Sequence, residues 1–388
     1  MSIRDFLEKA EAYLLGVIED RRQGGGARIL RVLLRGLSGL FSFVVRLRLR
    51  LYRHGLLRPH ELGCQVISIG NLTVGGTGKT PIVEVFARTL QKSGRKVAIL
   101  SRGYKKKEDP FLRRLVKKLT LNYVDDEPRV VSDGQRLLLD SSLAGDEPFM
   151  LATNLPSVAV IVDADRVKAG QYAIQKLGCD TLILDDGFQY LTLKHRYDIV
   201  LVDRTNPFGN RRLLPRGILR EPIRSIQRAG FIFITKSNGD GAEDLKRTLR
   251  QYNAHAEISE CRHSAKHLQN VFTGERQGLE FLKGLEVAAV SGIASPKGFE
   301  DELVRLGARV LYHKRFADHH RYQQQEIIEV INKGLQRGAK VVVTTEKDAV
   351  RFPMLERRDL PVFFLRVEIE MLSGADEFHE WIKRICFK

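Results

Sequence analysis

The sequence predicts an α/β protein with a mostly parallel sheet that is covered by helices on both faces. Apolar runs of four or five residues recur along the chain and alternate with helix-like stretches, which is typical of strands buried on both faces. A glycine-rich turn follows the first of these runs, and an arginine-rich amphipathic stretch precedes it. At 388 residues the chain is long enough for two domains.

The glycine-rich turn has the layout of a phosphate-binding P-loop. It lies between an apolar run at 65–69 and a helix-like stretch that begins at Pro81, although Thr73 stands where the usual pattern has glycine. Such glycines let main-chain amides approach a β-phosphate, while the lysine reaches the β/γ-phosphates and the threonine ligates Mg²⁺. The sequence therefore predicts a P-loop NTPase-like fold whose nucleotide site comprises Thr73, Val74, Gly75, Gly76, Thr77, Gly78, Lys79 and Thr80.

Two αβ series are visible along the chain. In the first, strands are expected at 97–100, 158–162, 181–184, 199–202 and 231–234. The stretch 236–285 is polar and weakly patterned, and a second series then runs from a strand at 287–291 to a helix at 376–385. We expect N-terminal basic amphipathic helices at 1–60, a P-loop domain at 61–235 and a smaller C-terminal α/β domain at 236–388.

The net charge of +17 is concentrated near the N-terminus, where residues 21–60 hold ten arginines and no acidic residue. The longest uncharged run there, 36–45, has ten residues, whereas spanning a bilayer needs about 20. We therefore predict an interfacial helix on an anionic membrane surface; the alternative is a basic helix packed on the protein's own core. Its arginines fall near one helical face: Arg28, Arg31, Arg35, Arg46, Arg50 and Arg53.

Nucleic acid is the other usual partner of basic proteins, but outside this stretch the charge is only mildly positive and no recognition module is present. The four cysteines, Cys64, Cys179, Cys261 and Cys386, are far apart and form no Cys-x-x-Cys pair. Their spacing predicts reduced cysteines in a cytosolic compartment, without a zinc site or a disulfide framework.

A P-loop needs a carboxylate at the end of a neighbouring strand to hold Mg²⁺. The run at 181–184 ends in Asp185 and Asp186, which supply it; a simple turn is the alternative interpretation. Two further motifs carry acid–base groups, Gly145-Asp-Glu-Pro148 and Phe316-Ala-Asp-His-His-Arg-Tyr322. A carboxylate-oriented imidazole can deprotonate a hydroxyl near neutral pH, but sequence distance does not pair Asp146 with His319.

Taken together, these motifs resemble the tetraacyldisaccharide 4′-kinases, the lipid A kinases of Gram-negative bacteria. The resemblance covers roughly residues 60–370 in the expected order, and the family shares the threonine at position 73. The matching segments are Ile69–Pro81, Ser101–Tyr104, Gly145–Pro148, Asp185–Gln189, Leu214–Pro222, Ser291–Ala294, Phe316–His319 and Thr345–Asp348.

The resemblance implies transfer of the γ-phosphate of ATP to the 4′-hydroxyl of a tetraacylated glucosamine disaccharide 1-phosphate, at the cytosolic face of the inner membrane. It implies that Asp146 and His319 activate the hydroxyl and that Thr80, Asp185 and Asp186 hold Mg²⁺. By the same resemblance, Arg220 and Glu221 contact the nucleotide, and residues 101–104 lie near the active site.

Two further residue expectations accompany the resemblance. Lys105 to Lys107 are predicted to meet the phosphate already present on the substrate. Tyr190 stands where the family commonly has histidine, which leaves the role of that position open.

A second hypothesis is a membrane-surface P-loop switch ATPase that recruits a partner and phosphorylates no lipid. The variant loop of such ATPases carries an extra lysine just before the paired glycines, and Val74 occupies that place here. The product of ATP turnover distinguishes the two hypotheses, because only a kinase yields a phosphorylated lipid. A nucleic-acid-stimulated ATPase would need salt-sensitive binding by residues 61–388. We expect a monomer that binds no nucleic acid.

Overall fold

The computed structural model describes residues 13–76, 78–103, 127–356 and 359–386. The chain divides into two compact units, neither of which is continuous in sequence. Unit 1 comprises Met1–Lys79, Asp180–Arg262 and Met371–Lys388, and unit 2 comprises Thr80–Cys179 and His263–Glu370. The predicted division at residues 60 and 235 stays a prediction.

Unit 1 is built on five parallel strands in the order β8-β7-β6-β1-β5. Every residue of the first strand, β1, is buried, as the apolar run at its start predicts. The strands are β1 (Gln65–Asn71), β5 (Thr181–Asp185), β6 (Tyr197–Asp203), β7 (Phe231–Thr235) and the first half of β8 (Glu257–Asn270). The expectation of a mostly parallel sheet is confirmed in this unit.

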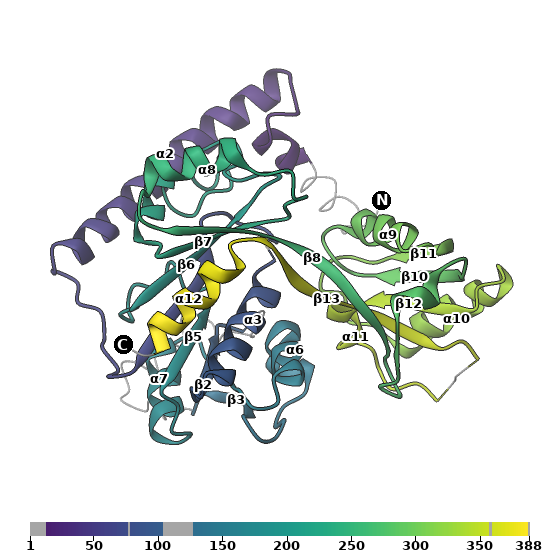
Figure 1. Ribbon diagram of the computed structural model, residues 1–388. Helices are drawn as coiled ribbons and strands as arrows, with labels where there is room; N and C mark the ends of the chain where they lie inside the picture. The colour runs from purple at the N-terminus through teal and green to yellow at the C-terminus, as the bar shows by residue number, and fades with distance from the viewer. Residues whose placement is uncertain (1–12, 77, 104–126, 357–358, 387–388) are drawn as a thin grey trace, which may run out of the picture. The chain divides into compact units, whose positions relative to one another are not determined.

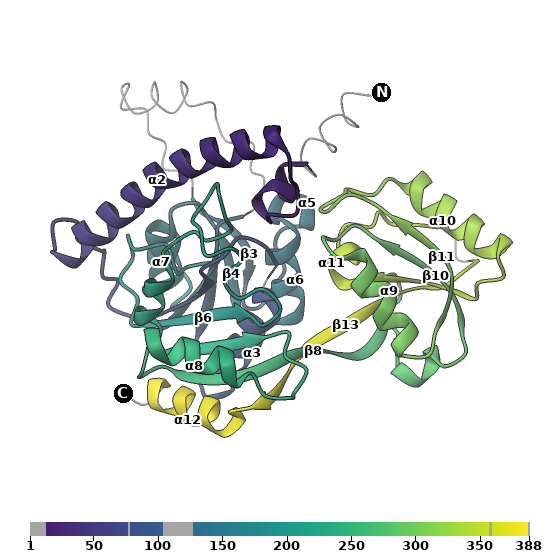
Figure 2. The same cartoon turned by 90° about the horizontal axis from the view of Figure 1, so that it is seen from above.

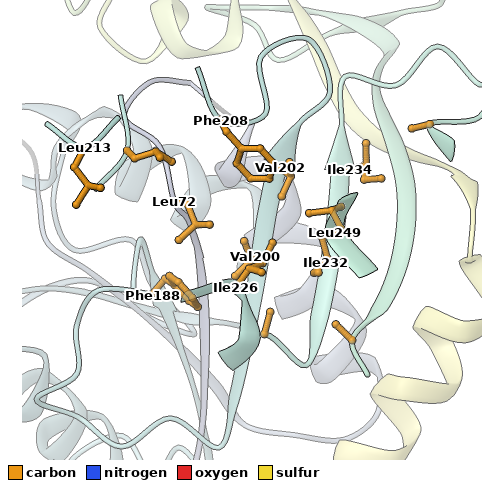
Figure 3. Close-up of a cluster of buried hydrophobic side chains, with 14 residues drawn as sticks. Leu72, Phe188, Val200, Val202, Phe208, Leu213, Ile226, Ile232, Ile234 and Leu249 are labelled. Carbon is orange, nitrogen blue, oxygen red and sulfur yellow. The ribbon is translucent and has the colours of Figure 1, made fainter. Parts of the chain in front are cut away.

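Helices cover both faces of the unit 1 strands. Alternate side chains of β7 point to opposite faces of the sheet, so each face contacts a different helix. Ile232 and Ile234 pack with Leu249 of α8 (Glu243–Tyr252) and with the 3-10 helix η1 (Ile223–Arg228), as Figure 3 shows. Phe231 and Phe233 instead meet Phe378 of the C-terminal helix α12 (Ala375–Cys386) in edge-on aromatic contacts. Figure 1 draws α12 in yellow.

The arginine-rich stretch forms one long helix of unit 1, α2 (Gly25–Arg53), which Figure 2 shows in purple. Its buried residues are Ala27, Leu34 and Ser38, and the Ser38 hydroxyl donates to the carbonyl of Leu213 at 2.8 Å. At about 100° per residue, the face opposite these contacts is apolar and exposed. It carries Ile29, Val32, Leu33, Leu37, Leu40, Phe43, Val44 and Leu47.

Unit 2 holds two groups of strands. The first group contains β2 (Val97–Ser101) parallel to β4 (Ala159–Val162), with β3 (Arg129–Asp133) antiparallel to β4. Around these strands lie the helices α3 (Lys79–Lys92), α5 (Ser141–Ala144), α6 (Asp146–Asn154) and α7 (Arg166–Gln175).

The second group of unit 2 is parallel in the order β11-β10-β12-β13. Its strands are β10 (Glu286–Ser291), β11 (Arg309–Arg315), β12 (Val341–Thr345) and β13 (Val362–Ser373). One face packs on α9 (Pro296–Arg305) and the other on α10 (Gln324–Gln336), with the short helix α11 (Glu346–Ala349) directly after β12.

The polar stretch 236–285 contains elements that its weak pattern did not indicate, namely α8, β8, the short strand β9 (Arg276–Gln277) and the 3-10 helix η2 (Leu279–Leu282). The strand β8 has few apolar residues, and β9 pairs with it in the antiparallel direction. Within the described residues no helix combines the length and the apolar character that crossing a bilayer requires.

Candidate active site

The glycine-rich turn connects β1 to the N-terminus of α3. Gly75 and Gly78 have φ values of 114° and 77°, a region in which a side chain would strain the backbone. The main-chain N–H of Val74 donates to the carbonyl of Ile218 at 2.8 Å, so a separate loop holds the first half of the turn. Thr77 lies outside the described residues.

Lys79 is the first residue of α3 and reaches back over the end of β1. Its ammonium donates to the Asn71 side-chain carbonyl at 3.3 Å and forms an ion pair with Asp186 at 3.0 Å. The side chain is mostly buried, with 16% exposed. The lysine of the turn and the end of β5 are therefore brought together within unit 1, as the motif predicts.

Asp186 is held between two cations in a left-handed backbone conformation, with φ of 54°. Arg220 donates to both of its carboxylate oxygens, at 2.9 and 2.7 Å, and Oδ1 is also the oxygen that Lys79 contacts. Burial raises the pKa of Asp186, but the charges of Lys79 and Arg220 outweigh burial and hold the pKa below its ordinary value. The Asp186 carboxylate is thus ionised and already neutralised.

Asp185 ends β5 directly beside β1, in register with Ile69. The following turn is pressed against β1, because Gly187 N–H donates to Ile69 at 3.1 Å. A Cβ at Gly70 would lie 2.7 Å from the Cβ of Phe188, closer than side chains approach. The missing side chain at Gly70 therefore sets the spacing between the two acidic residues and the P-loop strand.

Arg220 and Glu221 both lie in unit 1, and each has partners in the protein. Arg220 holds Asp186, while buried Glu221 accepts two hydrogen bonds from Arg228, at 2.9 and 3.3 Å. The guanidinium of Arg228 lies 4.1 Å from the centre of the Phe188 ring. Both residues thus border the turn after β5, and their contact with nucleotide stays a prediction.

The predicted Mg²⁺ donors are the Thr80 hydroxyl and the carboxylates of Asp185 and Asp186, an all-oxygen set that suits Mg²⁺. The described residues contain no cluster of three or more acidic, histidine or cysteine side chains that could hold a metal. Mg²⁺ is usually held by one or two protein groups together with substrate phosphates and water, and the three named donors stay a prediction.

Asp146 and His319, which are 173 residues apart, meet in unit 2. The Nδ1 of His319 lies 3.1 Å from Oδ2 of Asp146, and the Asp146 side chain is 7% exposed. A carboxylate on one ring nitrogen orients an imidazole and stabilises its protonated form. The arrangement can therefore accept a proton at the second ring nitrogen, Nε2.

Local main-chain structure orients the side chains of Asp146 and His319. Asp146 opens α6 after Gly145, whose φ of 91° reverses the chain. His319 lies in the loop after β11 with φ of 60°, and its N–H donates to the carbonyl of Gly292 at 3.2 Å. The parallel pairing of β10 with β11 brings Gly292 to the same end of the strands as this loop. Strand topology thus places the imidazole.

Three cations surround the Asp146–His319 pair. Arg321 approaches Oδ1 of Asp146 at 3.2 Å, and Arg351, whose side chain is fully buried, approaches Oδ2 at 3.5 Å. The ammonium of Lys347 lies 3.3 Å from Nε2 of His319. Lys347 falls within the segment Thr345–Asp348 that carries the family resemblance, but no role was predicted for it. Arg351 was not singled out, because nothing in spacing links residues after β12 to His319.

Of the remaining expected positions, some are described by the structure and some are not. Ser101 is buried at the end of β2. The main-chain N–H of Tyr190 donates to Gly187 at 2.7 Å, but this contact says nothing of its side chain, whose role stays open. Tyr104 and the lysines at 105–107 lie outside the described residues, so their expected contact with a substrate phosphate stays a prediction.

Comparison with known proteins gives a consistent result. Residues 30–386 match the family model of tetraacyldisaccharide-1-P 4′-kinase. A tetraacyldisaccharide 4′-kinase of Halothermothrix orenii is 35% identical over 96% of this chain and 98% of its own length. One of Anaeromyxobacter dehalogenans is 41% identical over 87% of this chain and 85% of its own length.

A solved structure agrees with this match. LpxK from Aquifex aeolicus, crystallised in complex with ATP, is 30% identical and covers 92% of this chain and 100% of its own, with a TM-score of 0.72. The P-loop turn beside β5, the fold and the sequence matches together lead to one conclusion: this chain belongs to the tetraacyldisaccharide-1-P 4′-kinase family.

Proposed function

We propose that the chain transfers the γ-phosphate of ATP to the 4′-hydroxyl of a tetraacylated glucosamine disaccharide 1-phosphate, a step of lipid A biosynthesis. The observation that carries the proposal is the P-loop with Lys79, in a chain that matches this kinase family over residues 30–386. Family membership does not favour the alternative of a switch ATPase that phosphorylates no lipid.

In the proposed mechanism, the main-chain amides of the P-loop and Lys79 hold the phosphates of ATP. Nε2 of His319 takes the proton of the sugar hydroxyl while Asp146 holds Nδ1–H. The hydroxyl oxygen bonds to the γ-phosphorus, the bond from that phosphorus to the β–γ bridging oxygen breaks, and ADP leaves with the electron pair. Thr80 with Asp185 or Asp186 would hold Mg²⁺, which would neutralise charge on the phosphates.

The activity test uses purified protein, γ-labelled ATP and the disaccharide 1-phosphate lipid in mixed micelles. The expected product is a doubly phosphorylated lipid that carries the label. Label that appears only as free phosphate would support a switch ATPase and overturn the kinase assignment.

The membrane association that we propose uses α2 and an anionic bilayer. Eight large apolar side chains are exposed on its outer face, and each buried CH₂ contributes about 0.8 kcal/mol. Of the six predicted arginines, five are exposed beside this face, and each contributes on the order of 1 kcal/mol at an anionic surface. Arg31 is the exception, because it is half-buried and forms an ion pair with Asp20 at 3.8 Å.

Vesicle sedimentation tests this association, with phosphatidylcholine vesicles with and without phosphatidylglycerol. Leu40→Asp on the apolar face should weaken binding to both compositions. Arg46→Gln should weaken binding about fivefold, and only where phosphatidylglycerol is present. Val304→Asp, at an exposed apolar position of α9, is the matched control and should leave binding unchanged. Binding of all variants equal to that of the wild type would exclude α2 as the contact.

A further inference from the structure

The ammonium of Lys347 lies at the ring nitrogen of His319 that the proposed mechanism uses. Lys347 belongs to α11, directly after β12, and its Nζ is 3.3 Å from Nε2 of His319. Asp146 lies on the opposite ring nitrogen, with Oδ2 at 3.1 Å from Nδ1. The imidazole is therefore held on both sides, by an anion and by a cation.

These two neighbours specify one tautomer of the ring. An ionised carboxylate only accepts hydrogen bonds, so the proton of a neutral imidazole must be on Nδ1, facing Asp146. An ammonium only donates hydrogen bonds, so Nε2 must present its lone pair to Lys347. Both contacts favour the form that can take a proton from a hydroxyl at Nε2.

Lys347 is aimed by buried ion pairs on either side of it in sequence. Glu346 accepts hydrogen bonds from Arg366 at 2.7 and 2.9 Å. Fully buried Asp348 accepts from Arg351 at 2.8 Å and from the N–H of Gly292 at 3.0 Å. Because the carbonyl of Gly292 also accepts from His319 N–H, one main-chain segment fixes both the lysine and the histidine.

Other charged groups face the pair as well. Arg321 and Arg351 approach Asp146 at 3.2 and 3.5 Å, so the carboxylate is held without Lys347. Two carboxylates lie within reach of the Lys347 ammonium, Glu147 at 3.5 Å and Asp318 at 3.8 Å. These carboxylates can therefore pair with the ammonium when it moves away from Nε2.

We propose that Lys347 is a positioning residue for His319, an inference that rests on the proposed function. Lys347 keeps Nε2 of the imidazole unprotonated and oriented toward the position of the sugar hydroxyl. The hydroxyl then takes the place of the ammonium. Glu147 and Asp318 receive the ammonium as the hydroxyl enters. Lys347 thus acts through His319 and does not itself bind the transferred phosphoryl group.

A double-mutant cycle in the full chain tests this. Lys347→Met keeps the length of the side chain and should lower kcat about five- to tenfold, a part of the ~10²–10⁴-fold that a general base supplies. In a His319→Ala background the same change should alter kcat less than about twofold, because its effect passes through the imidazole. KM for ATP should not change, and Lys347→Arg should recover most of the lost activity.

Two kinetic outcomes would overturn the inference. An equal loss from Lys347→Met with and without His319 would mean that the lysine contacts the substrate directly. No loss at all, with His319→Ala inactive, would refute the role of Lys347 and leave the proposed function intact. Full activity of His319→Ala would instead refute the proposed base itself.

A spectroscopic measurement tests the tautomer without any turnover. With ¹⁵N-labelled histidine in the full chain, the His319 ring should show a protonated Nδ1 and an unprotonated Nε2. Lys347→Met should introduce the other tautomer, whereas Lys333→Met, which removes a lysine that pairs with Glu329 on α10, should not. An unchanged His319 spectrum in Lys347→Met would contradict the inference.

Discussion

The two units hold their reactive groups in different ways. In unit 1 the P-loop lysine is the first residue of α3, and its partner Asp186 begins the turn after the neighbouring strand β5, so main-chain geometry positions the pair. In unit 2 the Asp146–His319 contact joins residues 173 apart and depends on surrounding ion pairs. Two short motifs that follow adjacent parallel strands thus specify the first site, whereas loops far apart in sequence and side-chain charge specify the second.

The largest expected effect falls on the Asp146–His319 pair. Asp146→Asn and His319→Ala should each lower kcat by roughly 10²–10⁴-fold, because a general base is lost. The double variant should be no worse than the poorer single variant, since the two residues act as one unit. Calorimetry with Mg-ATP should give wild-type affinity for all three proteins; an equal loss of ATP affinity would refute the separation of the two sites.

Removing the P-loop lysine should give the complementary result. Lys79→Met should lower kcat by roughly 10²–10³-fold, because a preorganised donor to the phosphates is lost. It should weaken ATP binding as well, which the variants of the Asp146–His319 pair should not. Lys92→Met, in the last turn of the same helix, is the matched control. Wild-type ATP affinity in Lys79→Met would place the triphosphate elsewhere.

A third variant tests whether unit 2 depends on buried charge. Arg366 is 7% exposed and pairs with Glu84 and with Glu346. Arg366→Leu leaves buried Glu346 without its cation and leaves Glu84 with Arg88 as its cation partner, and it should lower the free energy of unfolding by about 3–5 kcal/mol. Urea unfolding measures the change, and adding Glu84→Gln and Glu346→Gln should recover part of it.

The control for Arg366 is Arg305→Leu. That arginine pairs with Glu302 on the surface of α9, and such pairs contribute about 0–1 kcal/mol. A loss from Arg366→Leu no larger than that of the control would show that buried charge does not hold unit 2 together.

The smallest effect concerns the pH dependence of unit 1. The pKa of Asp186 lies below its ordinary value of about 3.9, so its ion pairs stabilise the folded state fully when the pH is above that value. This stability is lost as the pH falls through the lowered folded pKa. Because about a third of the side chain is exposed, the contribution should stay below about 1 kcal/mol.

Comparing Asp186→Asn with the wild type isolates that contribution. Burial raises the pKa of Asp203, but the hydrogen bonds from Lys236 and Thr205 and the charge of Lys236 together outweigh burial and lower it. A single acid unfolding curve would therefore mix the contributions of Asp186 and Asp203. The difference in free energy of unfolding between the two proteins should be constant at neutral pH and should shrink below about pH 3.9. A constant difference at all pH values would contradict the assignment.

The contrast between local motifs and contacts of residues far apart in sequence also explains which features could be predicted from the sequence. The P-loop and most buried strands were predictable, because each depends on a short run of adjacent residues. The strand β8 was missed because its sequence, Glu257–Asn270, has few apolar residues, and α8 was missed because only Leu249 is buried along it. The meeting of Asp146 with His319 followed only from the family resemblance, and the contact of Lys347 with His319 needed the packing of α11.

The C-terminal helix α12 has a consequence for synthesis and truncation. Unit 1 begins near the N-terminus but is completed by α12, whose Ile385 carbonyl accepts from the side chain of Gln65 in β1 at 2.9 Å. The Trp381 ring also makes edge-on contacts with the rings of Phe231 and Tyr197. Unit 1 therefore cannot finish folding before residues 375–386 have been synthesised. A premature stop near residue 370 would remove the helix that packs on β7 and contacts the start of β1, while both residues of the Asp146–His319 pair would still be encoded.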